Sequence, residues 1–371
     1  MKIGVPKEIK TQEYRVGLTP ESVSELVRAG HEVVVEANAG IGSGAQDADY
    51  TKVGARILPD AKSIFEAAEL IVKVKEPQPV ECAMLTPKHT LFTYLHLAAD
   101  KPQAEALMKS GAICVAYETV TNRAGRLPLL QPMSQVAGRM SVFVGANALM
   151  RTKRGRGLLL GGVPGVPAAN VVILGGGVSG THAAEMAIGC RANVTVFDRS
   201  MPRLEELDVQ FAGAVDTVYA TQHAIDRAVV EADMVIGAVL IPGASAPKLV
   251  SRAILKDMKP GAVLVDIAID QGGCFETSRP TTHDDPIYEI DGILHYCVAN
   301  MPGAVPRTST YALNNVTLPF ALDLANKGPK AALKADPHLA EGLNVAEGKI
   351  AHAAVARDLD LPFAQPAWLK G

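Results

Sequence analysis

The chain has 371 residues, of which 48% are hydrophobic and 20% are charged, and its formal net charge is −3. This length exceeds the roughly 250 to 300 residues at which one hydrophobic core stops growing, so we expect two domains with the active site in a cleft between them. Apolar runs fall short of the roughly 20 residues that span a bilayer, and there is no basic excess, so neither a membrane nor a nucleic-acid partner is expected.

The start of the chain and its cysteines indicate a cellular compartment. The first residues, MKIGVPKEIK, lack the apolar core of a signal peptide. The five cysteines are odd in number and lie far apart, at Cys82, Cys114, Cys190, Cys274 and Cys297. Such a set fits free thiols in a reducing environment better than a disulfide framework. We therefore predict a soluble, cytoplasmic protein.

The first third of the chain alternates between predicted helices and predicted strands. Thr19 is the expected N-cap of a helix that has Pro20 at its first position and Gly30 at its end. Further helices are predicted over residues 60–66 and 102–109, and strands over residues 31–36, 70–74, 90–94 and 112–117. This alternation predicts a parallel sheet with helices on both faces.

Two long helices are predicted on either side of a second α/β block, which begins at Asn170. The first covers residues 131–149, where apolar residues recur at helical spacing. The second covers residues 309–326, and Pro319 is expected to start or kink a turn within it. Residues 339–359 are also helix-like in pattern.

The order of these elements predicts an α/β fold with two Rossmann-like, doubly wound parallel-sheet domains linked by long helices. The first domain is expected to be discontinuous, with residues 1–130 plus 307–371, and to bind the substrate. Residues 131–306 are expected to form an NAD-binding Rossmann domain.

The second α/β block opens with a dinucleotide-binding pattern. A strand over residues 170–174 leads directly into GGGVSG, residues 175–180, which has GxGxxG spacing and precedes a predicted helix. Gly175 permits a tight turn, Gly177 lets a pyrophosphate approach the backbone, and Gly180 lets helix and strand pack closely. The N-terminus of the helix would offer N–H groups to the phosphates.

The acidic residue that ends the next strand bears on which dinucleotide is bound. That strand, residues 193–197, is followed by Asp198, whose carboxylate would accept hydrogen bonds from the adenosine ribose hydroxyls and repel a 2′-phosphate. This favours NAD over NADP. Arg199 and Arg203 follow and could bind a 2′-phosphate, so NADP stays an alternative.

Polar residues directly after strands are candidates for chemistry, because ligands of open α/β sheets bind at the carboxyl ends of strands. Lys75 closes the strand LIVKV, His96 follows FTYL, and Asp270 closes AVLVDIAI, while Glu118 after ICVAY is a structural candidate. Each residue taken alone is more often a solvated strand end, loop or turn residue. Their shared position after strands argues for a common site.

The residue types suit a reaction on a small acid. A lysine can hold a carboxylate, and a histidine titrates near neutrality and can move a proton. Arg15, in the loop before the helix capped by Thr19, could supply a second, bidentate grip on the carboxylate.

Several segments from the first to the last third of the chain resemble the alanine dehydrogenase/pyridine nucleotide transhydrogenase family. They are GVPKEIKTQEYRVGLTP, KVKEP, YLHLA, GGGVSG with VTVFDR, VDIAIDQGG and HYCVANMPGAVPRTST. The resemblance implies an alanine dehydrogenase, which interconverts L-alanine with pyruvate and ammonia, uses NAD, requires no metal and forms a homohexamer.

The resemblance also implies roles for individual residues. Lys75 and Arg15 would bind the substrate carboxylate and carbonyl, His96 would be the general acid and base, and Asp270 would be a second catalytic group. Cofactor contacts beyond the glycine turn would come from Ser134, Asp198, Arg203, Asn300 and Met301.

Three alternatives fit part of the pattern. The nearest is the soluble NAD(H)-binding subunit of a proton-translocating transhydrogenase, but the segment LQPMSQVAG at residues 130–138 favours alanine dehydrogenase. A non-catalytic NAD-binding protein would leave Arg15, Lys75, His96 and Asp270 unexplained. A dehydrogenase of a larger amino acid shares these motifs, and the pocket volume would separate it.

Overall fold

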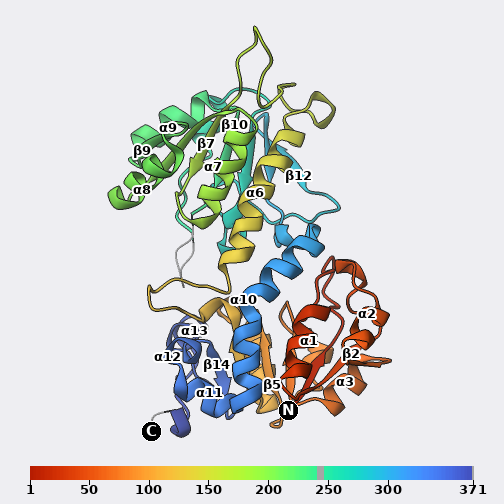
Figure 1. The fold of residues 1–371 in the computed structure, drawn as a ribbon. Coiled ribbons are helices and arrows are strands. Elements are labelled where there is room, and N and C mark those ends of the chain that lie inside the picture. Colours follow the sequence, from red (N-terminus) through yellow and green to blue (C-terminus); the bar gives the residue numbers. More distant parts are fainter. Residues whose placement is uncertain (240–245, 370–371) are drawn as a thin grey trace. The chain divides into compact units, whose positions relative to one another are not determined.

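The computed structural model describes residues 1–239 and 246–369, which form two compact units (Figure 1). The first unit contains Met1–Met133 and the chain from Gly303 onward, and the second contains Ser134–Pro302. These divisions lie a few residues from the domain boundaries expected at 130/131 and 306/307. Within the described ranges, no helix combines the length and the apolar character needed to cross a membrane.

The described part of the first unit has an eight-stranded sheet in the order β15-β14-β6-β5-β4-β1-β2-β3. From β6 to β3 all neighbours are parallel, and β14 is antiparallel to both of its neighbours. The strands are β1 (Lys2–Val5), β2 (Glu32–Glu36), β3 (Arg56–Leu58), β4 (Leu70–Val72), β5 (Thr90–Thr93), β6 (Ile113–Ala116), β14 (Leu343–Ala346) and β15 (Lys349–Ile350). The strand order reverses between β1 and β4, which makes their carboxyl ends the switch point of this sheet.

Both faces of this sheet are buried. Leu70 and Val72 of β4 belong to one apolar cluster, whereas Ile71 between them belongs to another, as expected for alternating side chains. The covering helices are α1 (Pro20–Arg28), α2 (Asp47–Lys52), α3 (Ala61–Ala67), α4 (Pro79–Cys82), α5 (Lys101–Ser110), α10 (Pro306–Lys327), α11 (Pro329–Ala335), α12 (Pro337–Ala340) and α13 (Ala353–Leu359). The predicted cap is present, since the Thr19 hydroxyl accepts from the Ser22 N–H at 3.2 Å.

The second unit has a seven-stranded sheet in its described part, in the order β12-β13-β11-β10-β7-β8-β9. All neighbours are parallel except β12 and β13. The strands are β7 (Asn170–Leu174), β8 (Asn193–Asp198), β9 (Asp216–Tyr219), β10 (Met234–Gly237), β11 (Val263–Asp266), β12 (Ile287–Ile290) and β13 (Ile293–Tyr296). The helices are α6 (Gln131–Ala148), α7 (Val178–Gly189), α8 (Met201–Phe211) and α9 (Gln222–Glu231). Its switch point lies between β7 and β10, so both units are Rossmann-like and the predicted α/β fold is confirmed.

One helix prediction is wrong, the proline expected to start or kink a turn lies within a continuous helix, and several strands were not predicted. Residues 339–359 are not one helix, because β14 and β15 lie within them and are joined by a turn in which Glu347 and Gly348 have φ of 52° and 73°. Helix α10 continues through the exposed Pro319 rather than starting a turn there. The central strand β1 lies in the N-terminal segment, for which no strand was predicted.

Candidate active site

The loops that follow β1 and β4 meet at the switch point of the first sheet, and they carry the two predicted substrate-binding residues. Arg15 lies in the chain after β1, and Lys75 lies three residues beyond Val72, where β4 ends. Lys75 therefore does not close the strand, as predicted, but belongs to the loop after it. Both side chains are nearly inaccessible, with 1% of Arg15 and 10% of Lys75 exposed.

The Arg15 guanidinium is held by a neighbouring acid. Its Nε donates to Glu13 Oε1 at 2.6 Å, its Nη2 donates to Glu13 Oε2 at 2.5 Å, and its Nη1 contacts Met133 Sδ at 3.0 Å. Burial by itself lowers the pKa of Arg15, but the hydrogen bonds and charge of Glu13 outweigh it and raise that pKa. The Nε and Nη2 edge of the guanidinium thus forms a bidentate pair with Glu13. The prediction had assigned bidentate binding by Arg15 to the substrate carboxylate.

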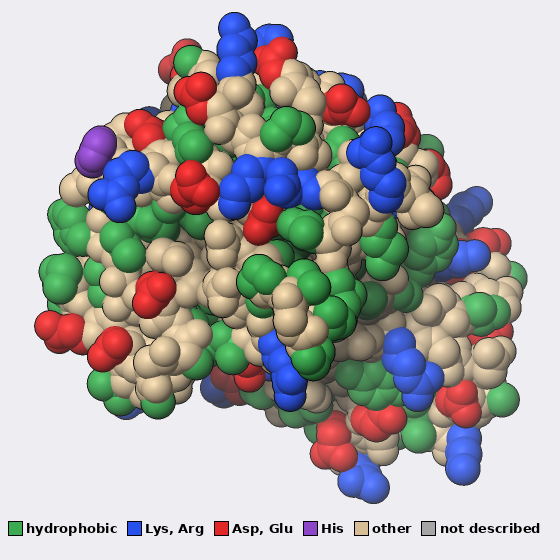
Figure 2. All heavy atoms as spheres, turned by 90° about the horizontal axis from the view of Figure 1, so that it is seen from above, with side chains coloured by type: hydrophobic (Ala, Val, Ile, Leu, Met, Phe, Trp, Pro, Cys, Tyr) green, Lys and Arg blue, Asp and Glu red, His purple; other side chains and the backbone are tan. Residues whose placement is uncertain are grey.

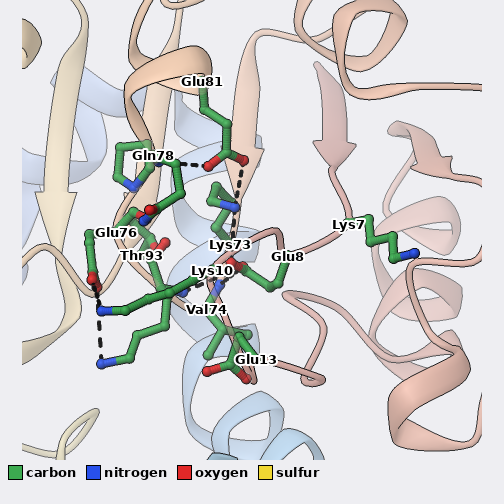
Figure 3. Close-up of polar contacts among 12 residues, drawn as sticks. Lys7, Glu8, Lys10, Glu13, Lys73, Val74, Glu76, Gln78, Glu81 and Thr93 are labelled. Carbon is green, nitrogen blue, oxygen red and sulfur yellow. Dashed lines mark hydrogen bonds and ion pairs between the residues drawn. The ribbon is translucent and has the colours of Figure 1, made fainter. Parts of the chain in front are cut away.

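Lys75 lies beside an acid that is shared with a second lysine. Its Nζ is 4.0 Å from Glu76 Oε2, and Glu76 Oε1 forms an ion pair with Lys10 (Figure 3). Burial alone would raise the pKa of Glu76, but the charges of Lys75 and Lys10 lower it, with a smaller contribution from His96. The Lys75 carbonyl accepts a hydrogen bond from the Thr93 hydroxyl at 2.9 Å. The Glu76 carboxylate thus lies between two lysines, and the backbone of Lys75 is held at its carbonyl.

His96 follows β5 and has a left-handed backbone, with φ of 52°. Its N–H donates to Glu118 Oε1 at 2.6 Å, and the Leu95 N–H donates to the same carboxylate at 3.1 Å. Its ring stacks on Tyr94, with centroids 5.7 Å apart and planes at 8°. The imidazole is exposed, and Glu118 has the structural role expected of it, because it secures the loop that presents His96.

A buried charged cluster beneath these loops was not predicted. Lys73 Nζ lies 3.0 Å from Glu8 Oε2 and 2.8 Å from Glu81 Oε1, and the three side chains are at most 2% exposed (Figure 3). A lysine directly after a run of apolar strand residues was the signal that could have found it, since a buried lysine requires a partner.

At the second sheet's switch point, the glycine turn after β7 has the geometry that the sequence predicts. Gly175 has φ of +103°, and a Cβ on it would lie 2.8 Å from the Ala238 carbonyl oxygen. A Cβ on Gly180 would lie 1.8 Å from the Gly175 carbonyl oxygen, so only glycine fits there. At Gly177, the N-cap of α7, a Cβ would meet open space, which leaves room for a phosphate to approach the helix N-terminus.

Asp198 and Arg203 both contact the middle of this turn. Asp198 Oδ2 accepts from the Gly176 N–H at 2.8 Å, and Arg203 Nε donates to the Gly176 carbonyl at 2.7 Å. Arg203 also donates to the Thr181 hydroxyl at 2.6 Å and forms an ion pair with Glu206. The structure therefore brings both residues to Gly176, which precedes them by more than 20 positions in the sequence.

Asp270 is placed differently from the prediction. Strand β11 ends at Asp266, and Asp270 lies in the following 3₁₀ turn, η6 (Ile267–Gln271), with an exposed side chain. The acid that closes the strand is Asp266, which is buried and accepts from Ser278 Oγ at 2.5 Å and from the Cys274 N–H at 2.9 Å. Burial raises the pKa of Asp266, and these donors oppose that rise. The motif VDIAID contains two acids, and only the fold distinguishes them.

The remaining predicted cofactor residues lie in α6 and in the segment after β13. Ser134 is half-buried in α6, and Asn300 is half-buried with φ of 60°. Met301 is 3% exposed and belongs to an apolar core cluster with Tyr296 and Val298. Its side chain thus packs in the core, and a contact with a ligand would come from its edge or backbone.

A cavity of about 1180 Å³ lies elsewhere in the second unit, along β8, β9 and α9. Its lining includes the acids Asp216, Asp226, Glu231 and Asp257, and none of the predicted site residues is among its lining in the described chain. Acids at this density would repel phosphates, so the cavity is not a candidate for the dinucleotide site.

The surface has no large field of one sign on the face in Figure 2, where basic, acidic and apolar side chains are interspersed. Two members of the basic run at residues 151–156 are paired with acids: Arg154 lies 3.3 Å from Glu289, and Arg156 lies 3.0 Å from Asp233. These pairs reduce the positive charge available to a polyanion.

Comparison with known proteins decides the family. Residues 4–137 match the family described as Alanine dehydrogenase/PNT, N-terminal domain, and residues 141–353 match Alanine dehydrogenase/PNT, C-terminal domain. The chain belongs to the alanine dehydrogenase/PNT family. This assignment makes it an oxidoreductase of a pyridine-nucleotide family.

Relatives in this family match the chain from end to end. The alanine dehydrogenase of Halomonas elongata is 57% identical over 371 residues, which is 100% of both chains. Those of Bacillus subtilis and Mycobacterium tuberculosis are 54% and 52% identical, covering 98% and 99% of this chain and 96% and 99% of the relatives.

Solved structures of the family separate its two branches. An L-alanine dehydrogenase is 53% identical, has a TM-score of 0.94 and is matched over 97% of this chain and 99% of its own. A transhydrogenase from Sinorhizobium meliloti is 26% identical, has a TM-score of 0.80 and is matched over 95% and 100%. Both the identity and the TM-score are higher for the L-alanine dehydrogenase, so the transhydrogenase alternative is not favoured.

Proposed function

We propose that this protein catalyses the reversible, NAD-dependent oxidative deamination of L-alanine to pyruvate and ammonia. Full-length relatives with 52–57% identity carry the name alanine dehydrogenase. The observation that carries the proposal is the placement of Arg15 and Lys75 after β1 and β4, at the switch point where a Rossmann-like sheet binds its ligand. The second unit has its glycine turn at the corresponding point, after β7.

The residues around the glycine turn fit NAD. Open space at Gly177 and the N–H groups of α7 would receive the pyrophosphate, and Asp198 would accept from the ribose hydroxyls. Arg203 already donates to Gly176, Thr181 and Glu206, so a 2′-phosphate would have to compete for it. Further contacts are proposed from Ser134, Asn300 and Met301. Bound NAD⁺ supplies the acceptor for the hydride.

On the substrate side, Lys75 and Arg15 are proposed to hold the carboxylate. The Lys75 ammonium supplies a point charge, and Arg15 is kept in one orientation by Glu13. Holding the carboxylate at fixed groups restricts the orientation of the alanine Cα, and this restriction lowers the entropic part of the barrier.

Proton transfers are proposed for His96 and Asp270. The exposed imidazole of His96 would act as general acid and base, while Asp270 would be a second group that activates water and accepts a proton during hydrolysis of the imine. Both side chains are exposed, so they are accessible to substrate and water.

The two predicted domains have separate proposed roles. Residues 1–130 plus 307–371 would bind the substrate and residues 131–306 would bind NAD, in a cytoplasmic homohexamer without a nucleic-acid or membrane partner. Sedimentation analysis of the purified protein measures the mass of the assembly. A monomer at assay concentration would contradict the proposed hexamer.

The test of the activity is NADH formation, followed by absorbance, with a panel of L-amino acids and with NAD or NADP. We expect the fastest turnover with L-alanine and NAD. Turnover of a larger amino acid would redefine the substrate, and faster turnover with NADP would overturn the coenzyme assignment. NADH binding without turnover of any amino acid would contradict the dehydrogenase.

A further inference from the structure

Three charged side chains are buried together where β1 and β4 end. Lys73 is 0% exposed and pairs with both Glu8 and Glu81, so the three groups carry a formal net charge of −1 (Figure 3). Removing charges from water is expensive, and well-packed apolar side chains of similar volume would often be as stable. A stabilising role is therefore a weak explanation for this cluster.

Glu8 differs from Glu81 in what else it holds. Glu8 Oε1 accepts from the Val74 N–H at 2.7 Å and from the Lys75 N–H at 3.4 Å, while its Oε2 accepts from Lys73. Glu81 Oε2 accepts from the Gln78 N–H at 2.8 Å, which caps α4. One glutamate thus binds the backbone beside Lys75, and the other binds a helix start.

The peptide groups on both sides of Lys75 are restrained. Glu8 accepts from the N–H groups of Val74 and Lys75, and the Thr93 hydroxyl of β5 donates to the Lys75 carbonyl at 2.9 Å. The backbone pairing of β4 with β5 continues as far as Val74, whose carbonyl accepts from the Tyr94 N–H at 3.2 Å, and Glu8 and Thr93 bind the N–H and the carbonyl of Lys75 itself. The backbone from which the Lys75 side chain extends is therefore held by Glu8 and Thr93 together with the Tyr94 N–H.

Lys73 favours the ionised form of Glu8. Burial raises the pKa of Glu8, and the charge of Lys73 and the Val74 N–H oppose that rise. Burial lowers the pKa of Lys73, but the charges of Glu8 and Glu81 outweigh it and raise that pKa. An ionised carboxylate accepts from all three donors without directing a proton of its own at any of them.

We propose that Glu8 is a positioning residue, which holds the backbone of Lys75 so that its ammonium meets the substrate carboxylate, and that Lys73 is the buried counter-ion of Glu8. This inference rests on the proposed function, because it assumes that Lys75 binds a carboxylate. Neither residue is expected to touch the substrate.

Glu8→Gln and Glu81→Gln form a matched pair of variants. Each removes one buried negative charge and one partner of Lys73, and each leaves Lys73 a remaining glutamate. We expect Glu8→Gln to raise KM for pyruvate and L-alanine about tenfold, with a smaller change in kcat and little change in KM for NADH. Glu81→Gln should leave these KM values within about twofold of the wild type.

Hydrogen exchange of the peptide around residues 73–78 tests the anchoring without relying on activity. We expect faster exchange in Glu8→Gln than in the wild type or Glu81→Gln, because the Val74 and Lys75 N–H groups lose a charged acceptor. Glu8→Asp is a second variant that keeps the charge but shortens the reach, and it should also raise KM for pyruvate. Glu8→Asp tests the inference if Glu8→Gln does not fold.

Equal KM changes in the two glutamine variants, or unchanged exchange in Glu8→Gln, would overturn the inference and leave the proposed function intact. A wild-type protein that turns over no amino acid would overturn the proposed function, and the assignment of Lys75 on which the inference depends would fall with it. A KM rise confined to the Glu8 variants, together with faster exchange, supports it.

Discussion

His96 has a backbone conformation that is costly for a residue with a Cβ. Its φ of 52° lies in the left-handed region, and the Glu118 carboxylate and the Tyr94 ring hold it there. Tyr94 is itself fixed by its hydroxyl, which donates to the Leu129 carbonyl at 2.6 Å. Strain that several neighbours maintain is common at functional sites, and here it holds an exposed imidazole at the end of β5.

Replacing His96 by alanine should lower kcat about a hundredfold or more, because a general acid and base contributes roughly 10² to 10⁴ to rate. The Kd for NADH should be unchanged, since the glycine turn lies in the other unit. Single-turnover and steady-state assays with L-alanine measure the loss. His31→Ala, at a partly exposed histidine that bonds to Asn326, is the control. Wild-type turnover in His96→Ala would remove this residue from the mechanism.

His295 is the residue from which a pH dependence of stability follows. It is fully buried, its Nδ1 lies 3.0 Å from the Ile293 carbonyl, and its Nε2 lies 2.7 Å from the Thr277 hydroxyl. Mainly because of burial, its pKa is lowered from 6.5 to about 4. The neutral imidazole therefore satisfies both partners, and the folded state resists protonation of this group.

We expect His295 to destabilise the fold as the pH falls. Between pH 6.5 and about 4 the unfolded chain binds a proton that folded His295 does not, so its contribution is present above this range and lost within it. The loss amounts to about 3 kcal/mol over the full range. Urea unfolding of the wild type and of His295→Gln at several pH values measures it. Equal pH slopes for the two proteins would contradict the prediction.

At the scale of elements, the turn between β7 and α7 shows two different requirements for glycine. Gly180 is required by the protein, because a Cβ there would lie 1.8 Å from the Gly175 carbonyl oxygen. Gly177 is not required by the protein, because a Cβ there would meet open space. A requirement for glycine at position 177 would therefore come from a ligand.

Gly177→Ala should weaken NADH binding about tenfold without lowering the free energy of unfolding, while Gly180→Ala should lower both by disrupting the turn. Fluorescence titration with NADH and urea unfolding measure the two quantities. Gly189→Ala, at the end of the same helix and with nothing within 4 Å, is the matched control and should change neither by much. Wild-type affinity for NADH in Gly177→Ala would show that the phosphates do not approach this position.

At the scale of the whole molecule, each large apolar cluster in the part of the chain that the structure describes draws its residues from one unit. The clusters around the first sheet contain residues such as Ile3, Phe92 and Leu313, and those around the second contain residues such as Ile173 and Val265. Each unit thus has its own core, as expected of a chain of this length. The second unit is also continuous in sequence.

We expect residues 131–302 to fold alone and to bind NADH, because this segment contains the complete second sheet and its glycine turn. Its Kd for NADH should be within about tenfold of that of the full chain. Circular dichroism and fluorescence titration check the fragment, with Gly177→Ala in the fragment as the control for specific binding. A fragment that remains unfolded in buffer would show that the first unit is needed for stability.

Prediction from sequence was most accurate where short-range patterns are sufficient. The strand, glycines and helix of the dinucleotide pattern are contiguous, and β7 and α7 form as expected. It was wrong for residues 339–359, because β14 is a strand by virtue of its pairing with β6, more than 200 residues away. It also chose Asp270 as the strand end, whereas hydrogen bonds from Ser278 and Cys274 hold Asp266 there.

The sequence by itself determined the α/β class, the glycine turn with Asp198, and the presence of lysine and histidine after strands, since each depends on residues close together in the chain. Only the tertiary structure decided which lysine of KVKEP is buried with Glu8, that Glu13 occupies an edge of Arg15, and that Arg203 grips Gly176. The physical reason is that burial and pairing of charges depend on the strand order, which brings the ends of β1 and β4 together across more than 60 residues of chain.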